Sequence, residues 1–401
     1  MVETCDALSL HNILRPEILV NPYPFYQRLR SEDPVHWDEN RDHWVLTRHA
    51  DVVAALRDPR FSAERILPED GGGVDPIAYA LSRQMLFLDP PDHTRLRTLV
   101  SKAFTPRVIE GMRPRVQAMA DELIDVVRGH GHMDLIADFA FPLPAIVIAG
   151  MLGVPSEDRD QFKVWSEDFG ALLSGTTLTA EEFEAASTGV FSLMNYFLGI
   201  IEERRREPRE DLLSGLVAAE EQGDKLDTQE LLVNLVLLLA AGHGTTTHLI
   251  GNGMLALLRN PEQLRLLRDN PSLIAGAVTE LLRYDGPVQA TGRNATEDLV
   301  IGGQPIRKGQ HVVTVLGAAN RDPAQFPDPD RLDVTRPEGR PVAFGYGIHH
   351  CLGAALARIE GQVAIGTLLR RLPDPRLETD APEYMPSIIF RSQISLPLAF
   401  G

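Results

Sequence analysis

Residues Phe344–Gly353 read FGYGIHHCLG, and they place Cys351 among three glycines directly before a predicted helix, Ala354–Leu369. Glycine permits backbone conformations that other residues rarely adopt, and a helix N-terminus presents unpaired N–H groups with partial positive charge. Both features favour a thiolate over a thiol. Three interpretations follow: a buried structural cysteine, a zinc ligand, or the single axial thiolate of a haem iron. Zinc is disfavoured, because one cysteine beside two adjacent histidines gives no recognised ligand spacing.

The composition around this loop is that of a globular protein. The chain has 401 residues, of which 44% are hydrophobic and 24% charged, and this balance excludes wholesale disorder. Acidic residues outnumber basic ones by 56 to 39, which gives a net charge of −17. Such a surface repels phosphate backbones, so we expect no nucleic-acid partner. The two cysteines exclude a disulfide framework.

No segment of the sequence predicts export or a membrane span. Met1–Leu10 lacks a basic region followed by an apolar one. The longest apolar stretch, Leu231–Ala241, has eleven residues and is broken by Asn234, whereas a membrane-crossing helix needs about 20. We therefore expect a cytoplasmic protein with no membrane partner.

The hydrophobic pattern predicts a mainly α fold with a smaller β lobe (α+β). From about residue 92 to 286, apolar residues recur at steps of three and four, which is typical of helices. Short β-type segments separated by turn residues occupy about 35–60, 287–318 and 385–399. We expect one compact domain over residues 1–401.

The Cys351 loop resembles the haem-binding loop of the cytochrome P-450 superfamily, and it matches the pattern Phe-Gly-x-Gly-x-His-x-Cys-x-Gly at every fixed position. The resemblance implies a triangular helical prism, with haem b (iron protoporphyrin IX) between a long central helix and the cysteine loop. It implies Cys351 as the ligand of the iron. The neighbouring residues implied to bind the haem are Phe344, Gly345, His349 and Gly353.

A second motif supports the resemblance. Glu280 and Arg283 resemble the family's Glu-x-x-Arg pair, and spacing of three places both charges on one helix face. In the family, an arginine of the following irregular stretch joins this pair and locks the haem-binding core; here the resemblance assigns that role to Arg331. Without the resemblance, the pair is an ordinary exposed ion pair.

The third motif lies in a long predicted helix, Thr228–Arg259. Its segment Ala241–Thr246 reads AGHGTT and resembles the family's oxygen-binding groove. The resemblance implies that Ala241 and Gly242 leave room for dioxygen and that Thr245 hydrogen-bonds it there. Two plainer interpretations stay open: the apolar face of a central helix, and a threonine that bonds back to the preceding turn.

The sequence departs from the family at Gly244, where an aspartate or glutamate is usual. In the family that carboxylate relays protons to reduced oxygen, and glycine carries no group able to do so. Three explanations are open. Water or the substrate supplies the protons; a nearby histidine, His243 or His248, takes part; or the site is altered and oxidises slowly.

Haem propionates are anions and need cationic partners. By resemblance the candidates are His93, Arg97, Arg293 and His349. Spacing of four places the first two on one face of the helix after Pro91. The alternative is a solvated basic helix.

Substrate contacts vary within the family, so the resemblance gives only approximate positions. The pocket residues expected are Leu86, Phe169, Leu238, Val288, Gln289, Thr291 and Ile389. Most are apolar, which favours a medium-sized hydrophobic substrate such as a terpenoid, steroid, macrolide or aromatic compound.

The expected activity is a haem-thiolate monooxygenase that inserts one atom of dioxygen into this substrate by hydroxylation or epoxidation. The sequence holds no flavin, nicotinamide or iron–sulfur fingerprint, so electrons are expected from an external ferredoxin or flavodoxin with its reductase. Six basic residues and one acid between His93 and Arg115 favour docking of an acidic partner, or simply form a solvated face. Two alternatives are a peroxide-using or oxidative-coupling enzyme, favoured by Gly244, and a non-catalytic haem protein that binds a ligand.

Overall fold

The computed structural model describes residues 7–64, 82–155, 178–209, 211–221, 227–337 and 339–401, with single positions 158, 161, 164, 165, 168, 169, 171 and 172 between them. By its internal contacts the chain divides into two compact units. Unit 1 comprises Met1–Ser62, Met112–Phe141 and Thr245–Gly401, and unit 2 comprises Ala63–Gly111 and Pro142–Gly244.

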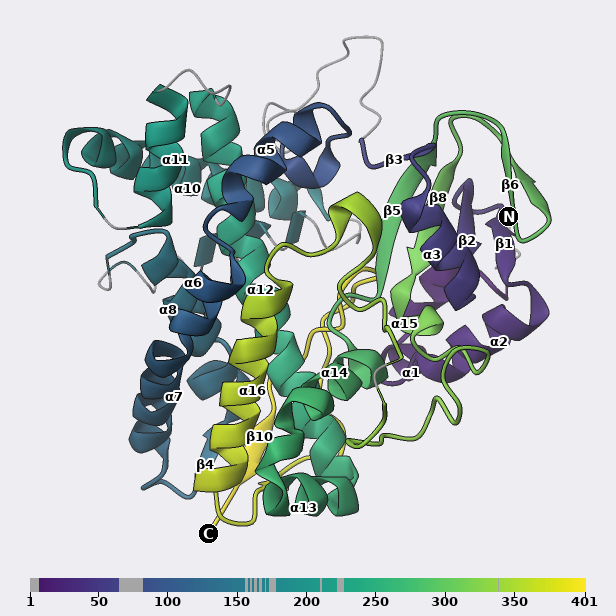
Figure 1. The fold of residues 1–401 in the computed structure, drawn as a ribbon. Coiled ribbons are helices and arrows are strands. Elements are labelled where there is room, and N and C mark those ends of the chain that lie inside the picture. Colours follow the sequence, from purple (N-terminus) through teal and green to yellow (C-terminus); the bar gives the residue numbers. More distant parts are fainter. Residues whose placement is uncertain are drawn as a thin grey trace. The chain divides into compact units, whose positions relative to one another are not determined.

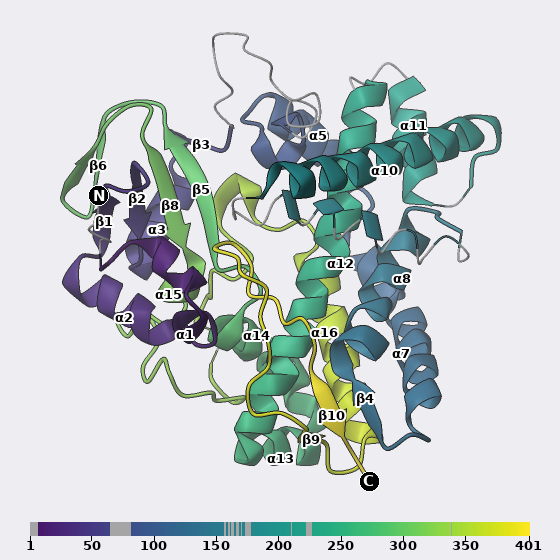
Figure 2. The ribbon, with the colours of Figure 1, turned by 180° about the vertical axis from the view of Figure 1, so that it is seen from behind.

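The main sheet of unit 1 has the strand order β1-β2-β8-β5-β3 (Figure 2). Its central pair, β2 and β8, is parallel, with Val45 opposite Val313, and β5 joins β8 antiparallel with Gly292 opposite Val313. The strands are β1 (Val35–Asp38), β2 (His43–Leu46), β3 (Phe61–Ser62), β5 (Ala290–Ala295) and β8 (His311–Val315).

Both faces of this sheet are covered. Successive side chains of a strand point to opposite faces, and β2 shows the consequence. Trp44 and Leu46 pack with the buried residues of α3 (His49–Arg57), whereas Val45 packs with those of α2 (Tyr23–Glu32). The remaining small strands of unit 1 are β4 (His132–Asp134), β6 (Leu299–Ile301), β7 (Gln304–Ile306), β9 (Arg376–Leu377) and β10 (Pro397–Ala399).

Longer helices form the rest of unit 1, and α16 (Ala354–Arg371) lies at their centre (Figure 1). It packs on α7, α14 and α13. Where α14 meets α16, a side chain at Gly361 would bring its Cβ to 3.2 Å from Val278, so the two helices approach closely. The helices are α7 (Arg113–Val127), α13 (Pro261–Asp269) and α14 (Ile274–Asp285), with the short elements η1 (Leu10–Leu14), α1 (Pro16–Leu19), η3 (Ile136–Ala140), η5 (Pro271–Leu273), α15 (Leu316–Ala319) and η6 (Gly347–His349).

Unit 2 is helical in its described residues. Its longest complete helix, α10 (Ala180–Arg206), starts with a capping box in which Thr179 and Glu182 satisfy each other's backbone N–H groups. The other elements are η2 (Met85–Phe87), α5 (Asp92–Ser101), α6 (Pro106–Gly111), α8 (Pro142–Met151) and α11 (Leu212–Glu221).

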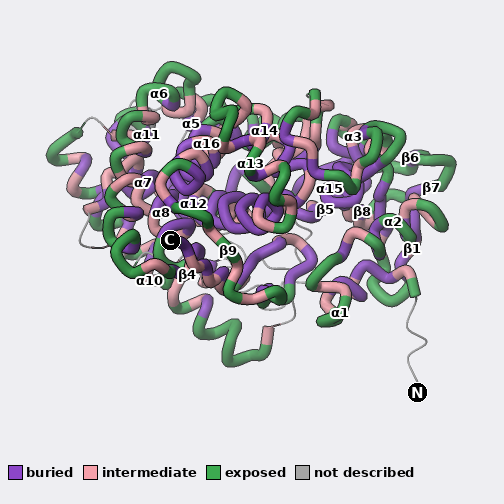
Figure 3. The backbone as a smooth tube through the Cα atoms, turned by 90° about the horizontal axis from the view of Figure 1, so that it is seen from below, coloured by how far each residue is buried: buried purple, intermediate pink, exposed green. Residues whose placement is uncertain are grey.

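Helix α12 (Thr228–Arg259) has the bounds that the sequence predicts, and it begins with two capping contacts. The Asp227 N–H donates to Glu230 at 3.2 Å, and the Glu230 N–H donates to Asp227 at 2.7 Å. By length and composition this helix would suffice to cross a membrane, but 67% of its most apolar window is buried inside the protein, as the purple turns of α12 show (Figure 3). That burial is typical of the core helix of a soluble protein.

The predicted β-rich segment at 385–399 is wrong in most of its length. Its only regular strand in the described residues is β10, together with single bridges at Phe390 and Gln393. The segment is instead fastened by buried side chains, since Arg391 donates to Asp285 at 2.6 Å. A buried charge pair needs a particular chain path, and alternating hydrophobicity does not report it.

Candidate active site

The Cys351 loop is closed by backbone hydrogen bonds and two left-handed glycines. Gly345 and Gly347 have φ values of 68° and 72°, a region that residues with a Cβ rarely adopt. The Cys351 N–H donates to the Phe344 carbonyl at 2.9 Å and closes the loop. Cys351 is exposed, and α16 begins three residues later. The loop therefore presents the sulfur at the N-terminus of a long helix.

The glycines of this loop serve different purposes. A Cβ at Gly347 would lie 2.3 Å from the Leu56 carbonyl oxygen, so the protein itself requires glycine there. A Cβ at Gly353 would meet no atom within 4 Å. The space beside Cys351 is thus left open by the protein, as a ligand that approaches the sulfur would require.

The ring of Phe344 in this loop contacts an arginine of α16 and a histidine of the loop itself. The Arg358 guanidinium carbon lies 4.5 Å from the centre of the Phe344 ring, which is a cation–π distance. Phe344 also faces His350, with ring centres 6.3 Å apart. These contacts fix the loop relative to the helix that follows it.

The middle of α12 presents an open face. Leu231–Leu239 and Leu249–Leu257 are buried, whereas Ala241 is exposed and Gly244, Thr245 and His248 are half-buried. Positions 241, 244, 245 and 248 are separated by steps of three and four, so they share one face of the helix. This open face of α12 carries the Thr245 hydroxyl. The plainer interpretation, the apolar face of a buried central helix, therefore does not account for these four positions.

The two glycines of this segment differ in their surroundings. A Cβ at Gly242 would lie 2.9 Å from the Ile148 side chain of α8, so close packing requires glycine at this position. A Cβ at Gly244 would meet no atom within 4 Å. Gly244 is therefore not imposed by packing, and the helix has room for a larger side chain there.

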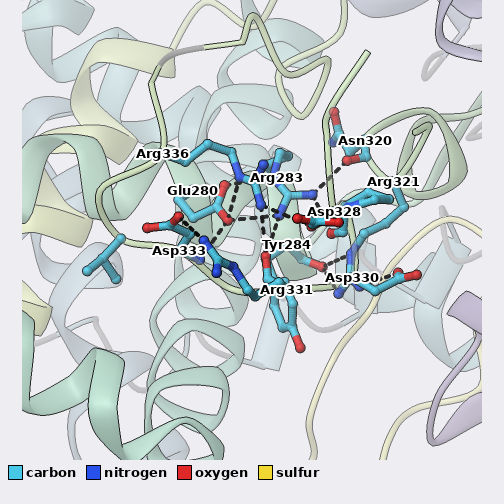
Figure 4. Close-up of polar contacts among 12 residues, drawn as sticks. Glu280, Arg283, Tyr284, Asn320, Arg321, Asp328, Asp330, Arg331, Asp333 and Arg336 are labelled. Atoms are coloured by element: carbon cyan, nitrogen blue, oxygen red, sulfur yellow. Dashed lines mark hydrogen bonds and ion pairs between the residues drawn. The ribbon is translucent and has the colours of Figure 1, made fainter. Parts of the chain in front are cut away.

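A buried ion-pair cluster joins α14 to the irregular stretch that follows α15 (Figure 4). Arg283 donates to both carboxylate oxygens of Glu280, at 2.6 and 2.8 Å, and both side chains are 2% exposed. The pair is thus fully desolvated, not the exposed pair that spacing alone allows.

The arginine that completes this cluster is Arg336. Its guanidinium donates to Glu280 at 3.1 Å and also to the backbone carbonyls of Pro327, Asp328 and Arg331. The assignment of this role to Arg331 is wrong: the Arg331 side chain is 68% exposed and pairs with Asp333. Arg331 contributes its backbone carbonyl, which accepts from Arg283.

Comparisons with known proteins agree with this geometry. A family model described as cytochrome P450 matches residues 171–373. The chain is 46% identical over 411 residues to cytochrome P450 CYP107DY1 of Priestia megaterium, covering 98% of this chain and 99% of that protein. The chain belongs to the cytochrome P450 family. This P450 is also 43% identical to the vitamin D(3) 25-hydroxylase of Pseudonocardia autotrophica, over 100% of this chain and 99% of that protein.

A solved structure supports the same fold. The crystal structure of P450BioI in complex with hexadec-9Z-enoic acid ligated acyl carrier protein matches with a TM-score of 0.92 and 41% identity, covering 96% of this chain and 99% of that chain. The predicted fold class is confirmed, and so is the class of enzyme: this P450 is a monooxygenase, an oxidoreductase of a family that uses haem.

The residues of this P450 fit a haem thiolate. Cys351 offers an exposed sulfur at a helix N-terminus, and Gly353 leaves the adjacent space open. Among the described residues, no group of three or more His, Cys, Asp or Glu side chains is placed to hold a metal ion. A single-thiolate site is the kind that haem iron uses, whereas a structural zinc site needs four ligands.

The four candidate propionate partners belong to different units of the P450. In unit 2, His93 is 3% exposed and Arg97 is half-buried, and the two residues lie four positions apart on α5. In unit 1, Arg293 on β5 is 8% exposed and His349 of η6 is half-buried. The interpretation of α5 as a solvated basic helix does not hold for these positions.

The expected pocket residues differ in exposure. Leu86 is exposed, and Val288, Thr291 and Ile389 are half-buried, whereas Phe169 and Leu238 are buried. Gln289 is also buried, and its amide donates to the Gly286 carbonyl at 2.7 Å. Its side chain thus fastens the start of β5 within unit 1, which leaves Thr291 as the partly exposed polar side chain of this set.

His243 is poorly suited to carry protons as a cation. Burial lowers its pKa to about 4, against which a hydrogen bond with the Leu239 backbone acts only in part. The ring is therefore neutral at pH 7, and its side chain is 5% exposed. Of the two histidines considered for the proton supply, only His248 lies on the open face of α12.

The same pKa predicts loss of stability in acid. The unfolded chain binds a proton at His243 below its ordinary pKa of 6.5, and the folded chain only near pH 4. Stability from this group is therefore complete above pH 6.5 and is lost as the pH falls towards 4, by ~3 kcal/mol in total. We expect His243→Leu to flatten the pH dependence of the unfolding free energy in this range, measured by urea titration. The exposed His130→Gln serves as the control and should leave the slope unchanged; an unaltered slope in His243→Leu would contradict the assignment.

Sequence reasoning missed two ionised residues and one buried acid. Arg336 lies in a stretch without periodicity. Glu230, which caps α12, also binds Arg95 at 2.6 Å, and this removes Arg95 from the charges available to a docking partner. The third is Glu360 on α16, which is 1% exposed although acidic residues are rarely buried.

Proposed function

We propose that this P450 binds haem b through the Cys351 thiolate and inserts one atom of dioxygen into a hydrophobic small molecule, by hydroxylation or epoxidation. The observation that supports this most is that unit 1 contains both an exposed Cys351 before α16 and a half-buried Thr245 in the middle of α12. We further propose that residues 1–401 form a single P450 domain, located in the cytoplasm.

Each proposed role is assigned to a particular side chain of this P450. When bound, the haem supplies the activation of dioxygen, which no side chain of the protein can perform. The Cys351 thiolate would hold the haem iron, and its electron donation would favour O–O cleavage. Thr245 donates or accepts a hydrogen bond at the open face, and Ala241 with Gly244 keeps that face free of bulk. The cationic partners proposed for the propionates are His93, Arg97, Arg293 and His349, each of which would offset their negative charge.

The proposed electron source is an external ferredoxin or flavodoxin with its reductase. Support comes from charge: the chain carries −17 overall, yet the stretch from His93 to Arg115 contains six basic residues and one acid. A local reversal of charge steers an acidic partner, although Arg95 is already paired. The same overall charge disfavours nucleic acid.

The substrate class can be tested by titrating purified ferric protein with representatives of several scaffolds. The panel contains a steroid, a terpenoid, a macrolide, an aromatic compound and free hexadec-9Z-enoic acid. We expect a saturable low- to high-spin change in haem absorbance with one class, because a bound apolar molecule displaces the water on the iron. No change with any class would contradict a free hydrophobic substrate and favour one tethered to a carrier.

Gly244 favours the second candidate function, a peroxide-using or oxidative-coupling enzyme. Product formation with hydrogen peroxide, but not with ferredoxin and reductase, would establish it. A haem protein that binds a ligand without turnover is the third candidate, and the Thr245 hydroxyl on an open helix face argues against it.

Replacing Gly244 tests whether proton delivery limits the reaction. We expect Gly244→Glu to raise the product formed per electron consumed by about tenfold, since a positioned acid contributes at least that much. A Cβ added at this position meets no atom within 4 Å, so the substitution starts without a steric clash. Gly244→Gln is the matched control, because it adds similar bulk without an ionisable group. Equal yields from the two variants would exclude a proton-relay deficit.

A further inference from the structure

Helix α10 presents large apolar side chains on a face that the rest of the chain leaves exposed. Phe191 is 56% exposed, and Leu198, two turns further along the helix, is 37% exposed. The exposed positions around them recur at alternating steps of four and three, so they share one side of the helix. This α10 stripe consists of Glu184, Thr188, Phe191, Asn195, Leu198 and Glu202, all of which are exposed.

A glycine beside the stripe has no packing role within the described chain. Gly199 is exposed in the interior of α10, and a Cβ added there would meet no atom within 4 Å. Glycine is less favourable in a helix interior than any residue except proline, because it loses the most backbone freedom. Its presence leaves a flat place on the helix surface, into which a bulky side chain of another molecule can pack.

The charges of opposite sign on this side of α10 lie at opposite ends of the helix. Glu184 is in the second turn, and Arg206 is the last residue. Arg205 already binds Glu202, whereas no ion pair joins Glu184 or Arg206 to another described residue. Both side chains are exposed. An acid at one end and a base at the other are thus available to a partner.

These features are arranged symmetrically about Asn195. Phe191 lies four residues before it and Gly199 four residues after it, while Glu184 lies eleven before and Arg206 eleven after. An aromatic ring and a flat place, and an acid and a base, are therefore placed at equal distances from one point on the helix. A surface of this kind is complementary to itself, which is what a two-fold symmetric dimer requires.

We propose that two copies of this P450 form a homodimer through their α10 stripes, which run antiparallel about a two-fold axis at Asn195. In this register Phe191 packs over Gly199 of the second copy, and Glu184 lies opposite Arg206 of the second copy. Because the axis is two-fold, each of these contacts is made twice. The inference does not rest on the proposed function.

Electrostatics select the antiparallel orientation. It brings the acidic start of one helix beside the basic end of the other, and the two helix dipoles also run in opposite directions. A parallel pair would instead align Glu184 with Glu184 and Arg206 with Arg206. At the axis each Asn195 amide donates to the carbonyl oxygen of the other, and a polar pair of this kind fixes the register of paired helices.

The net charge of −17 on each copy opposes association only at long range. At physiological ionic strength the Debye length is about 8 Å, so charges on distant parts of the two copies are largely screened. The facing pairs of Glu184 and Arg206 are in contact and are screened less. We therefore expect a dimer that dissociates on dilution rather than a permanent one.

Sedimentation velocity of the ferric holoenzyme tests the association. We expect the wild type to change from monomer to dimer between about 1 and about 200 µM, as a transient interface would. Phe191→Ser should raise the dissociation constant about tenfold, because it removes the ring that fills the contact with Gly199. The control is Val126→Ser on α7, where the side chain is 70% exposed, and it should leave the constant unchanged. A wild type that stays monomeric throughout would overturn the proposal and leave the stripe to a different partner.

Exchange of the two charges tests the register. Glu184→Arg and Arg206→Glu should each weaken the dimer about tenfold, since each places two pairs of like charge in contact. The double variant restores opposite charges in reversed order and should return to within about threefold of the wild type. Both residues are exposed, so the variants should stay folded. Failure of the double variant to recover would refute the pairing of Glu184 with Arg206.

Cysteine cross-linking tests the position of the axis. In a Cys5→Ser background, Asn195→Cys places two thiols at the axis, where the Cα atoms lie within the separation of about 4.4–6.8 Å that a disulfide needs. Mild oxidation should then give a covalent dimer. Thr188→Cys is the matched control on the same stripe, and its two copies would lie about 20 Å apart along antiparallel helices.

The pattern of cross-links decides the arrangement. We expect a covalent dimer from Asn195→Cys alone, and none from Thr188→Cys or from Cys5→Ser without a further change. Cross-linking at both positions would refute the antiparallel orientation, and cross-linking at neither would refute the axis at Asn195. None of these readouts involves turnover, so failure of the dimer would leave the proposed function untouched.

Discussion

Replacing Cys351 by histidine is expected to abolish the thiolate-type carbon monoxide spectrum and to reduce monooxygenase turnover below detection. Histidine can still bind haem iron, but it does not donate the electron density that a thiolate supplies for O–O cleavage. The residue is exposed, so the substitution removes no core packing, and the protein should stay folded. The measurement is the difference spectrum of the reduced protein with and without carbon monoxide.

The other cysteine provides the control. Cys5→Ser should retain both the thiolate-type spectrum and turnover, since Cys351 alone lies in the glycine-rich loop. Persistence of the spectrum in Cys351→His would refute the axial-ligand assignment. Its loss in Cys5→Ser would transfer the role to the N-terminal cysteine.

The sequence predicts the backbone of the Cys351 loop well because local rules govern it. Left-handed glycines, a cysteine and a helix start lie within ten consecutive residues, and the structure places Gly345, Gly347 and α16 accordingly. The two ends of α12 are also set by nearby residues, because capping residues and the regular spacing of apolar residues determine where a helix begins and ends. The open face of α12 depends on residues far away in the sequence. It exists because side chains of other elements leave the space beside Gly244 and Thr245 unfilled.

Two features escape prediction for a physical reason. Glu360 lies in a helix whose pattern gives no sign that this acid faces inward, because burial is decided by α7, α12 and α14 around it. Arg331 and Arg336 are both arginines of one irregular stretch. No periodicity fixes the direction of either side chain there, so spacing from a motif selects the wrong one.

The structure predicts opposite results for these two arginines. Arg336 is 12% exposed and binds the 2%-exposed Glu280, so its removal leaves a buried carboxylate with one donor fewer. We expect Arg336→Leu to lower the unfolding free energy by ~3 kcal/mol and to reduce the haem bound per protein, because a broken buried pair is costly. Arg331→Leu should change the unfolding free energy by less than ~0.5 kcal/mol, since its pair with Asp333 is at the surface.

Urea unfolding and haem content of the two purified variants measure this difference. Arg336→Lys separates charge from geometry: it keeps the positive charge but loses the planar fork that also reaches the Pro327, Asp328 and Arg331 carbonyls. We expect it to fall between wild type and Arg336→Leu. If Arg331→Leu were the more damaging substitution, the family-based assignment would hold after all. If neither substitution changed the unfolding free energy, Arg283 alone would stabilise Glu280. Contacts other than those of Arg336 would then hold the irregular stretch in place.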